Sequence, residues 1–456
     1  MRILIVGAGV VGFNLAQELS QEGHDIAIID RNGEKIKRIA DSLDVLAIEG
    51  NACLPSVLVQ AGIETMEMVI AVTERDEINL MVCFFAFKFK VGKRIARLRQ
   101  EEFTGNGQVF APSELFIDQA INPGQIIVDT VSKIISTPGA VNVAEFAQGE
   151  ILLREFDVPD NAPLAGKTIE EIGGVSVMDS FLVVAIAREG QLIIPRGNDT
   201  IQSGDKIYTV VDKEFLPFLL PMLNKTVEEV EKVIIFGANG VSISLAKVLE
   251  EKIRDLSIIE PSREKANKAA EVLTRCVVQH GSGTDLNLFN DINMEEADYF
   301  LSLSDDDEAN ILSALLAKKH GAKRVMVITN DPEYLPILDS IGMDVTINPR
   351  LITVSAILKH LRKGRVMSVF KLIEDAEVME IEVDSDSSIA NKKISKLNFL
   401  QNAMIGALLR KGEMMVPDPE TQILPGDVVI VVALPQAIEK IEKLFGRKRK
   451  ILPFMK

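Results

Sequence analysis

Three glycines near the start of the chain have the spacing of a loop that holds phosphate groups. They are Gly7, Gly9 and Gly12, in the segment Gly7-Ala8-Gly9-Val10-Val11-Gly12. In such a loop the first glycine permits a tight turn, the second lets the backbone approach a pyrophosphate, and the third lets a helix pack closely on a sheet. An apolar run, residues 3–6, precedes the loop, and a helical pattern, residues 13–20, follows it. The phosphates of a ligand would therefore lie at the positive N-terminus of a helix.

An acidic residue follows at the end of the next apolar run. Asp30 comes directly after residues 26–29, where its carboxylate would accept hydrogen bonds from the 2′ and 3′ hydroxyls of a ribose. Its charge would repel a 2′-phosphate, which favours NAD over NADP. It does not distinguish NAD from ATP or ADP, which carry the same adenosine ribose. The loop and Asp30 together predict a nucleotide site, and the alternative is a glycine turn in an α/β fold that binds no nucleotide.

Two further polar segments follow strand-like runs, at positions where ligands bind to parallel sheets. Asn51 and Ala52 follow the run 45–48, and Thr73 and Glu74 follow the run 69–72. These residues would flank the adenosine. As isolated residues at strand ends they are equally typical of plain turns.

Two arginines have a spacing suited to binding terminal phosphates. Arg97 and Arg99 are two residues apart in the strand-like segment Ile95-Ala96-Arg97-Leu98-Arg99, so both side chains would point to one face. Two guanidiniums there would each offer paired donors to phosphate oxygens. The alternative is that they form surface ion pairs with Glu101 and Glu102.

The chain contains a second copy of this pattern. Val233-Ile234-Ile235-Phe236-Gly237 matches Ile3-Leu4-Ile5-Val6-Gly7, and at the same offset along the chain Glu260 matches Asp30. The second loop is Gly237-Ala238-Asn239-Gly240-Val241-Ser242, in which Asn239 and Ser242 replace two glycines. The arginine positions become Val327 and Thr329. We therefore expect nucleotide binding at the second copy to be weaker, differently selective or absent.

The other residues that could do chemistry form no recognisable catalytic or metal site. None of the three tyrosines has a lysine four residues later, and of the four histidines only His280 is close in sequence to a cysteine, Cys276. Hydride transfer needs an acid or base beside the carbonyl, and a metal site needs more ligands than these two residues. We therefore expect no catalytic residue and no metal ligand, and the chain would not be an enzyme.

The elements that would position these residues alternate short β-branched runs with helical stretches. This alternation is typical of a doubly wound parallel sheet with right-handed crossovers. A second repeat lies between and after the two copies, and it matches the Gly204-Asp205 turn to the Gly426-Asp427 turn. There, short alternating strands around turn glycines and one short helix predict a small α+β domain.

The two repeats together give an A–B–A–B order. We predict an α/β fold with two Rossmann-like doubly wound parallel-sheet domains, each followed by a small α+β domain. The expected domains are residues 1–135, 140–227, 228–358 and 367–450.

Composition and charge exclude several classes of partner. The 456 residues are 47% hydrophobic and 25% charged, which is typical of a globular chain. A net charge of −16 repels phosphate backbones, so we expect no nucleic-acid partner. The longest apolar runs, 80–87 and 428–434, are far shorter than the roughly 20 residues of a membrane span, and we expect no direct membrane insertion. Three cysteines without a paired motif fit a reducing cytosol.

With these motifs and this domain order, the chain resembles the TrkA family, the cytosolic regulatory subunits of bacterial Trk potassium-uptake systems. Its A units resemble RCK (regulator of potassium conductance) N-terminal domains, and its B units resemble RCK C-terminal domains. The resemblance covers essentially the whole chain. It rests on the glycine loop with Asp30, the segment from Thr73 to Asn79, the strand with Arg97 and Arg99, and the two Gly-Asp turns.

The resemblance implies a homo-tetrameric ring that is peripheral on the cytoplasmic face of the plasma membrane. The ring would dock beneath a potassium-conducting membrane protein of the TrkH or TrkG type. The implied ligands are NAD(H) and ATP or ADP, held by Gly7 to Val11, Asp30, Thr73, Glu74 and Arg97, and less firmly by Gly237 to Val241 and Glu260.

Two other functions stay open at this stage. One is an RCK-type regulator of another potassium channel or transporter, and the other is an NAD-dependent oxidoreductase. The basic tail, Arg447-Lys448-Arg449-Lys450, is either a solvated chain end or a contact with the membrane surface.

Overall fold

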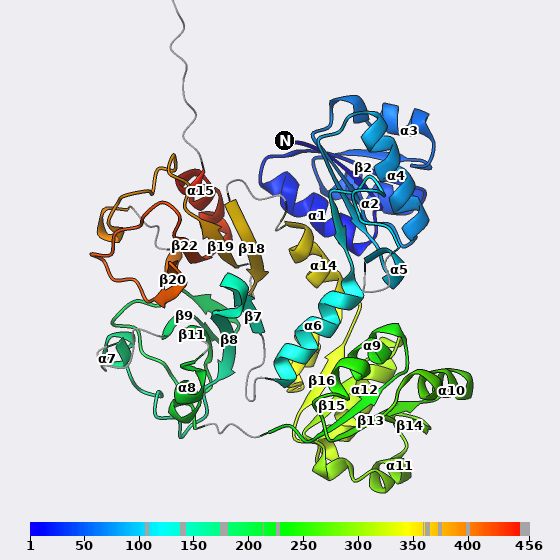
Figure 1. The fold of residues 1–456 in the computed structure, drawn as a ribbon, viewed down its shortest axis with the longest axis vertical. Coiled ribbons are helices and arrows are strands. Elements are labelled where there is room, and N and C mark those ends of the chain that lie inside the picture. The colour runs from blue at the N-terminus through cyan, green and yellow to red at the C-terminus, as the bar shows by residue number, and fades with distance from the viewer. Residues whose placement is uncertain are drawn as a thin grey trace, which may run out of the picture. The chain divides into compact units, whose positions relative to one another are not determined.

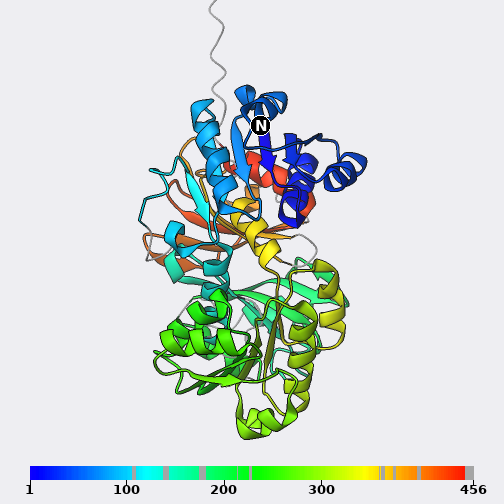
Figure 2. The ribbon, with the colours of Figure 1, turned by 90° about the vertical axis from the view of Figure 1, so that its right-hand side faces the viewer.

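The structure is a computed structural model, and it describes residues 1–104, 109–136, 143–173, 181–212, 214–224, 229–358, 360, 365–372, 376–397 and 402–446. The chain divides into two compact units, Met1–Asp129 with Glu231–Leu358, and Thr130–Val230 with Lys359–Lys456 (Figure 1, Figure 2). The first unit pairs the two A copies and the second unit pairs the two B copies. The basic tail from Arg447 to Lys450 lies outside the described residues.

The first copy is built on a six-stranded sheet in the order β3-β2-β1-β4-β5-β6, with parallel pairing throughout. Its strands are β1 (Arg2–Val6), β2 (Asp25–Asp30), β3 (Leu46–Glu49), β4 (Met68–Ala71), β5 (Lys93–Arg97) and β6 (Gln119–Ile121). Its helices are α1 (Val10–Gln21), α2 (Gly33–Ser42), α3 (Pro55–Gln60), α4 (Asp76–Lys88), α5 (Glu101–Thr104) and α6 (Pro123–Ile135), with a 3₁₀ turn at Ile63–Thr65.

The apolar runs form central strands because both faces of this sheet are covered. Ile3, Leu4 and Ile5 of β1 are fully buried, as is Ile28 of β2. The strand order reverses between β1 and β4. The carboxyl ends of these two strands therefore flank the crevice where ligands bind in this class of sheet.

The second copy repeats this architecture in a sheet of order β14-β13-β12-β15-β16-β17. Its strands are β12 (Lys232–Phe236), β13 (Asp255–Glu260), β14 (Val277–His280), β15 (Tyr299–Ser302), β16 (Val325–Ile328) and β17 (Val345–Ile347). Its helices are α9 (Gly240–Leu249), α10 (Arg263–Val272), α11 (Leu286–Asp291), α12 (Asp307–Lys319), α13 (Leu335–Ser340) and α14 (Pro349–Leu358), with 3₁₀ turns at Met294–Glu296 and Pro332–Tyr334.

The two parallel-sheet copies exchange contacts through the helices that follow their last strands. Helix α14 of the second copy packs against α1 and β6 of the first, and Figure 1 shows α14 beside α1. In the opposite direction, a Cβ placed on Gly124 at the start of α6 would lie 3.4 Å from Val241 Cγ2 of α9. The copies of the first unit are therefore joined by helices, and among the described residues no strand of one sheet pairs with a strand of the other.

The B copies are antiparallel five-stranded sheets in the orders β10-β9-β11-β8-β7 and β18-β19-β22-β20-β21. The first has β7 (Val143–Phe146), β8 (Ile151–Asp157), β9 (Phe181–Arg188), β10 (Gln191–Ile193) and β11 (Lys206–Asp212), with α7 (Ile169–Gly173), α8 (Leu216–Met222) and a 3₁₀ turn at Ala147–Gly149. The second has β18 (Arg365–Lys371), β19 (Glu377–Glu382), β20 (Ala403–Arg410), β21 (Glu413–Met415) and β22 (Val428–Ala433), with α15 (Pro435–Phe445) and a 3₁₀ turn at Ile394–Lys396.

The same arginine–aspartate pair fixes the Gly-Asp turn of each B copy. Arg188 binds Asp205 through two hydrogen bonds of 2.8 Å, and Arg410 binds Asp427 through bonds of 2.9 and 2.8 Å. The two B copies also share a hydrophobic core, in which Val184 and Tyr208 belong to the same cluster as Ala407 and Ile430. The predicted fold class is confirmed, with two Rossmann-like parallel-sheet domains and two small α+β domains. No helix among the described residues is long and apolar enough to cross a membrane.

Candidate functional site

The glycine loop is closed at its ends and open in its middle. Gly7 has a φ of +110°, and a Cβ there would lie 3.0 Å from the Thr73 nitrogen, while a Cβ on Gly12 would lie 1.8 Å from the Gly7 carbonyl oxygen. Neither position has room for a side chain. A Cβ on Gly9 would have no neighbour within 4 Å among the described residues, so a ligand can approach the backbone there.

Helix α1 begins directly in this loop, at Val10. In the part of the chain that the structure describes, no side chain caps this helix, and its first turn contains no acidic residue. The N–H groups of that turn are therefore available to anionic oxygens, and the positive end of the helix dipole adds to the attraction.

Asp30 joins the end of β2 to the glycine loop. Its Oδ2 accepts a 2.6 Å hydrogen bond from the Ala8 nitrogen, and its Oδ1 accepts a 2.9 Å bond from the Asn32 nitrogen. The carboxylate is half-buried at the pocket wall and keeps further lone pairs for ribose hydroxyls. Next to it, Arg31 Nη2 donates a 2.6 Å bond to Asn51 Oδ1, which ties the segment after β2 to the segment after β3.

A buried asparagine holds the ends of β4 and β5 together. The Asn79 Oδ1 accepts bonds of 3.0 and 2.7 Å from the Thr73 nitrogen and hydroxyl, and its Nδ2 donates bonds of 3.1 and 2.7 Å to the carbonyls of Thr73 and Arg97. Nearby, Asp76 Oδ2 accepts bonds of 2.8 and 2.9 Å from the nitrogens of Arg99 and Gln100. Two polar side chains at the start of α4, Asp76 and Asn79, therefore fix the backbone of Arg99 and Arg97 by hydrogen bonds.

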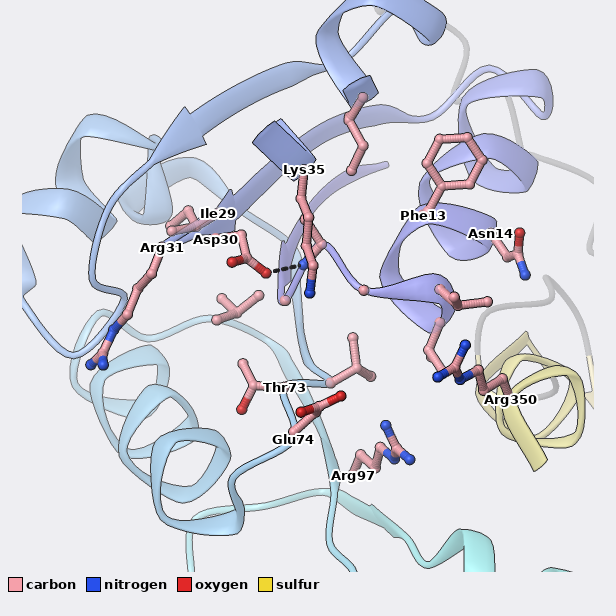
Figure 3. Close-up of a pocket in the computed structure, with 18 of the residues that line it drawn as sticks. Phe13, Asn14, Ile29, Asp30, Arg31, Lys35, Thr73, Glu74, Arg97 and Arg350 are labelled. Atoms are coloured by element: carbon pink, nitrogen blue, oxygen red, sulfur yellow. Dashed lines mark hydrogen bonds between the residues drawn. The ribbon is translucent and has the colours of Figure 1, made fainter. Parts of the chain in front are cut away.

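A cavity of about 770 Å³ lies at this carboxyl edge, within the range of small-molecule and cofactor sites. Most residues of the first copy that the sequence analysis selected line it, namely Gly7, Ala8, Gly9, Val10, Val11, Asp30, Asn51, Ala52, Thr73, Glu74, Arg97 and Arg99. Gly12 does not line the cavity, because it packs against Gly7. Figure 3 shows Asp30 and Arg31 on one side of the cavity and Arg97 on the other, with Thr73 and Glu74 between them.

Several residues that line the cavity were missed by the sequence analysis. From the first copy these include Phe13, Asn14, Arg31, Lys35 and Arg38, and from the second copy they are Asn330, Asp331, Pro332, Glu333 and Arg350. The basic residues that follow Asp30 were a signal that could have been used. Arg350 could not be found in this way, because nothing in the sequence places it near the first copy.

Three arginines of the cavity lack ion-pair partners in the described part of the chain. Among these residues, Arg97, Arg99 and Arg350 form no ion pair within 4.0 Å, and Glu101 instead accepts a 2.6 Å bond from Ser244. Burial, followed by the charge of Arg99, lowers the pKa of Arg97 to about 10, with Arg350 contributing and Glu74 and Asp76 opposing. The Arg97 Nε is buried with no hydrogen-bond partner in the described ranges. These cations surround a space suited to an anion.

The second copy uses its corresponding residues for its own structure. Glu260 accepts 2.7 Å bonds from the nitrogens of Ala238 and Ser262, as Asp30 does from Ala8 and Asn32, but its side chain is buried. Asn239 caps α9 and donates 2.7 and 3.0 Å bonds to the Leu303 carbonyl and to Asp305. Gly237, Gly240 and Val241 complete this loop.

The sequence analysis matched Arg97 and Arg99 to Val327 and Thr329, and this match is wrong by one residue. Ile328 pairs with Ile347 as Arg97 pairs with Ile121, and the Asn330 nitrogen donates to Asp307 as the Arg99 nitrogen donates to Asp76. Ile328 and Asn330 therefore stand at the positions of the two arginines.

No group of three or more His, Cys, Asp or Glu side chains in the described ranges is arranged to hold a metal ion. His280, near Cys276 in sequence, lies 3.1 Å from the Pro261 carbonyl through its Nε2. Cys53, Cys83 and Cys276 are free thiols.

Two family models match the chain, and each matches twice. The TrkA-N domain matches residues 3–123 and 233–349, and the TrkA-C domain matches residues 153–214 and 378–446. These four segments fall on the two parallel-sheet copies and the two antiparallel-sheet copies respectively.

Known proteins resemble the chain along almost its whole length. It is 31% identical over 451 residues to the Trk system potassium uptake protein TrkA of Azorhizobium caulinodans, covering 98% of each chain. It is 33% identical over 455 residues to the Trk system potassium uptake protein TrkA homolog 1 of Methanosarcina mazei, covering 98% of this chain and 100% of the relative. A solved structure of the GsuK channel bound to NAD covers 97% of this chain and 78% of its own, with a TM-score of 0.60 and 17% identity. That last likeness shows a shared fold.

Proposed function

This chain belongs to the TrkA family, and from that premise we propose that it is a nucleotide-binding regulatory subunit of a potassium-uptake system. It binds NAD(H) and ATP or ADP in the cavity of the first copy, and it gates a membrane partner of the TrkH or TrkG type. The proposal includes a homo-tetramer held on the cytoplasmic face of the plasma membrane through that partner. The proposal also divides the chain into four domains, residues 1–135, 140–227, 228–358 and 367–450.

The observation that carries the proposal is the cavity itself. Its volume is about 770 Å³, and its wall contains an uncapped helix N-terminus and a carboxylate bonded to the glycine loop. The wall also contains three arginines, Arg97, Arg99 and Arg350, that form no ion pair among the described residues. Asp30 would hold the ribose hydroxyls, and the N–H groups of the loop would hold the phosphates. The names of the relatives support potassium uptake, and the GsuK structure bound to NAD supports a nucleotide in this fold.

Regulation would follow from linkage between the cavity and the gate. A ligand shifts a conformational equilibrium only by its difference in affinity for the two states, and the gate must in turn change the affinity for the nucleotide. The cavity is lined by both parallel-sheet copies, so a bound nucleotide is placed to favour one arrangement of the copies.

The second copy is proposed to bind nucleotide less strongly than the first copy. Asn239 uses its amide for the cap of α9 and for the bond to Leu303, and Ile328 and Asn330 stand at the positions of Arg97 and Arg99. We also propose that neither copy is catalytic, so nucleotides are bound and released unchanged.

The proposal is tested by calorimetric titration of the full chain with NADH, NAD, ATP and ADP. Wild type is compared with Asp30→Ala and with Asp25→Ala, which removes an exposed carboxylate from the opposite end of the same strand. We expect binding by wild type and Asp25→Ala, a loss of about tenfold or more in Asp30→Ala, and no turnover of any ligand.

Each outcome of this titration has a definite meaning. Failure of all four nucleotides to bind wild type would contradict the proposal and leave the glycine loop as a purely structural turn. Turnover with an alcohol or carbonyl substrate would favour an oxidoreductase. In the same experiment, the double variant Arg97→Ala/Arg99→Ala should reduce the preference for ATP over ADP, if these arginines reach a terminal phosphate. Co-purification with the membrane partner tests the role in potassium uptake.

A further inference from the structure

Arg350 enters the cavity of the first copy from the second copy. We infer that this residue binds the terminal phosphates of a nucleoside triphosphate held on the Gly7–Gly12 loop, so that the second copy completes the site of the first. The inference rests on the proposed nucleotide binding. It adds a binding residue, the class of ligand, and a role for the second copy in the site of the first.

The local structure fixes Arg350 firmly at the edge of the cavity. Strand β17 ends at Ile347, and the buried Asn348 then accepts 3.0 Å hydrogen bonds from the nitrogens of Arg350 and Leu351. Pro349 begins α14, whose packing on α1 brings its first turn beside the glycine loop. The arginine is thus carried by a capped helix start and lines the cavity, half-buried.

The charges around Arg350 favour an anion. Figure 3 shows Arg350 and Arg97 on the side of the cavity away from Asp30, where the phosphate chain of a nucleotide with its ribose at Asp30 would extend. Arg97 and Arg350 repel each other, and neither forms an ion pair among the described residues, although the chain has a net charge of −16. Two or three guanidiniums without carboxylate partners are stabilised by phosphate oxygens, which accept their paired donors.

The arrangement is asymmetric, and the asymmetry points to the terminal phosphates of one ligand. Ile347-Asn348-Pro349-Arg350 matches Ile121-Asn122-Pro123-Gly124 position by position, so the second site receives a glycine where the first receives an arginine. At the second site, all three cations of the first are absent. The second copy thus carries an arginine for the other copy's ligand and lacks an arginine at each of the three corresponding positions of its own site.

The consequence is a clamp that depends on the length of the phosphate chain. A triphosphate would contact the loop of the first copy and Arg350 of the second at once. AMP, whose single phosphate is held by the loop, would not reach Arg350. Binding energy that both copies share favours the arrangement in which they are close.

The test is calorimetric titration of the full chain with ATP and AMP, using wild type, Arg350→Ala, Arg350→Lys and Arg254→Ala. Arg254 is a matched control on the second copy, since its side chain is 86% exposed and lies outside the cavity. We expect Arg350→Ala to weaken ATP about ten- to hundredfold while AMP binds as in wild type, because a charge-assisted hydrogen bond is lost. Arg350→Lys should retain part of the ATP affinity, and Arg254→Ala should retain all of it.

Two results with the Ala variant would overturn the inference and leave the proposed function intact. One is an ATP affinity equal to that of wild type. The other is an equal loss of ATP and AMP affinity, which would mean that Arg350 supports the structure of the site and does not read the phosphates. If wild type binds neither ATP nor AMP while NADH binds, the inference alone fails, and if no nucleotide binds, the proposed function fails with it.

Discussion

Burial decides which of the reactive side chains of this chain can act. Arg97 keeps its proton below about pH 10 even though burial lowers its pKa, so its guanidinium is charged at neutral pH and can bind phosphate. The same effect acts in the opposite direction on thiols, because it disfavours the negative form. Burial raises the pKa of both Cys83 and Cys276 to about 12, whereas Cys53 is partly exposed.

This difference predicts the order in which the cysteines react. The thiolate is the nucleophile, and a group with a pKa of about 12 is almost entirely in the thiol form at pH 8. We expect iodoacetamide at pH 8 to alkylate Cys53 in the native chain, and Cys83 and Cys276 only after unfolding in guanidinium chloride. Peptide mass spectrometry measures the extent at each site. Modification of Cys83 in the native chain at the rate of Cys53 would contradict the assigned burial.

At the scale of elements, each parallel-sheet copy uses one asparagine to connect two strand ends. Asn310 repeats the bonds of Asn79, accepting from the Ser304 nitrogen at 2.8 Å and donating to the carbonyls of Ser304 and Ile328 at 2.9 and 3.1 Å. Both asparagines are fully buried. The fold therefore depends on the same polar connection in both copies, but only in the first copy does it hold residues of the cavity.

Replacing each asparagine by alanine separates structure from binding. We expect Asn79→Ala and Asn310→Ala each to destabilise the chain by about 2–3 kcal/mol, because buried backbone groups lose their partners. Asn79→Ala should also weaken nucleotide binding, since Thr73 and Arg97 lose their common anchor. Thermal unfolding and calorimetry of the two variants make the comparison. An equal loss of nucleotide affinity in Asn310→Ala would show that the second copy's strand ends matter equally for the ligand.

At the scale of the whole molecule, duplicated domains pair with their own kind. The two A copies form one compact unit and the two B copies form the other, although A and B alternate along the chain. In the second unit the packing is close at Gly406, where a Cβ would lie 2.7 Å from Val184 Cγ1 and 3.3 Å from Val210 Cγ2. These contacts join residues from different B copies.

The close approach at Gly406 predicts that a larger residue will strain the packing of the B copies. We expect Gly406→Val to destabilise the second unit by about 1–3 kcal/mol through overpacking, with nucleotide affinity unchanged because the cavity belongs to the first unit. The matched control is Gly240→Ala, since a Cβ on Gly240 would meet nothing within 4 Å among the described residues. Thermal unfolding measures the stability of both variants. If Gly406→Val unfolds at the same midpoint temperature as wild type, the prediction is contradicted, and the two B copies have room to accommodate the larger side chain.

Much of the fold and part of the cavity were predictable from the sequence, because they depend on short-range patterns. The loop from Gly7 to Gly12, Asp30 and the two internal repeats are readable along the chain, and they determined the fold class and the first copy's candidate site. Arg97 and Arg99 were also found through their spacing, although Arg99 lies beyond the end of β5 and is placed by Asp76.

Only the tertiary structure decided how the copies combine. The contact of α14 with α1 joins segments more than three hundred residues apart, and no periodicity or propensity encodes which helix face meets which. That packing depends on complementary surfaces. It places Arg350 and the segment 330–333 in the wall of the cavity. The sequence by itself determined the parts of each domain, because hydrogen bonds and turns are local. The structure decided which domains share a site, because side-chain packing acts across space and not along the chain.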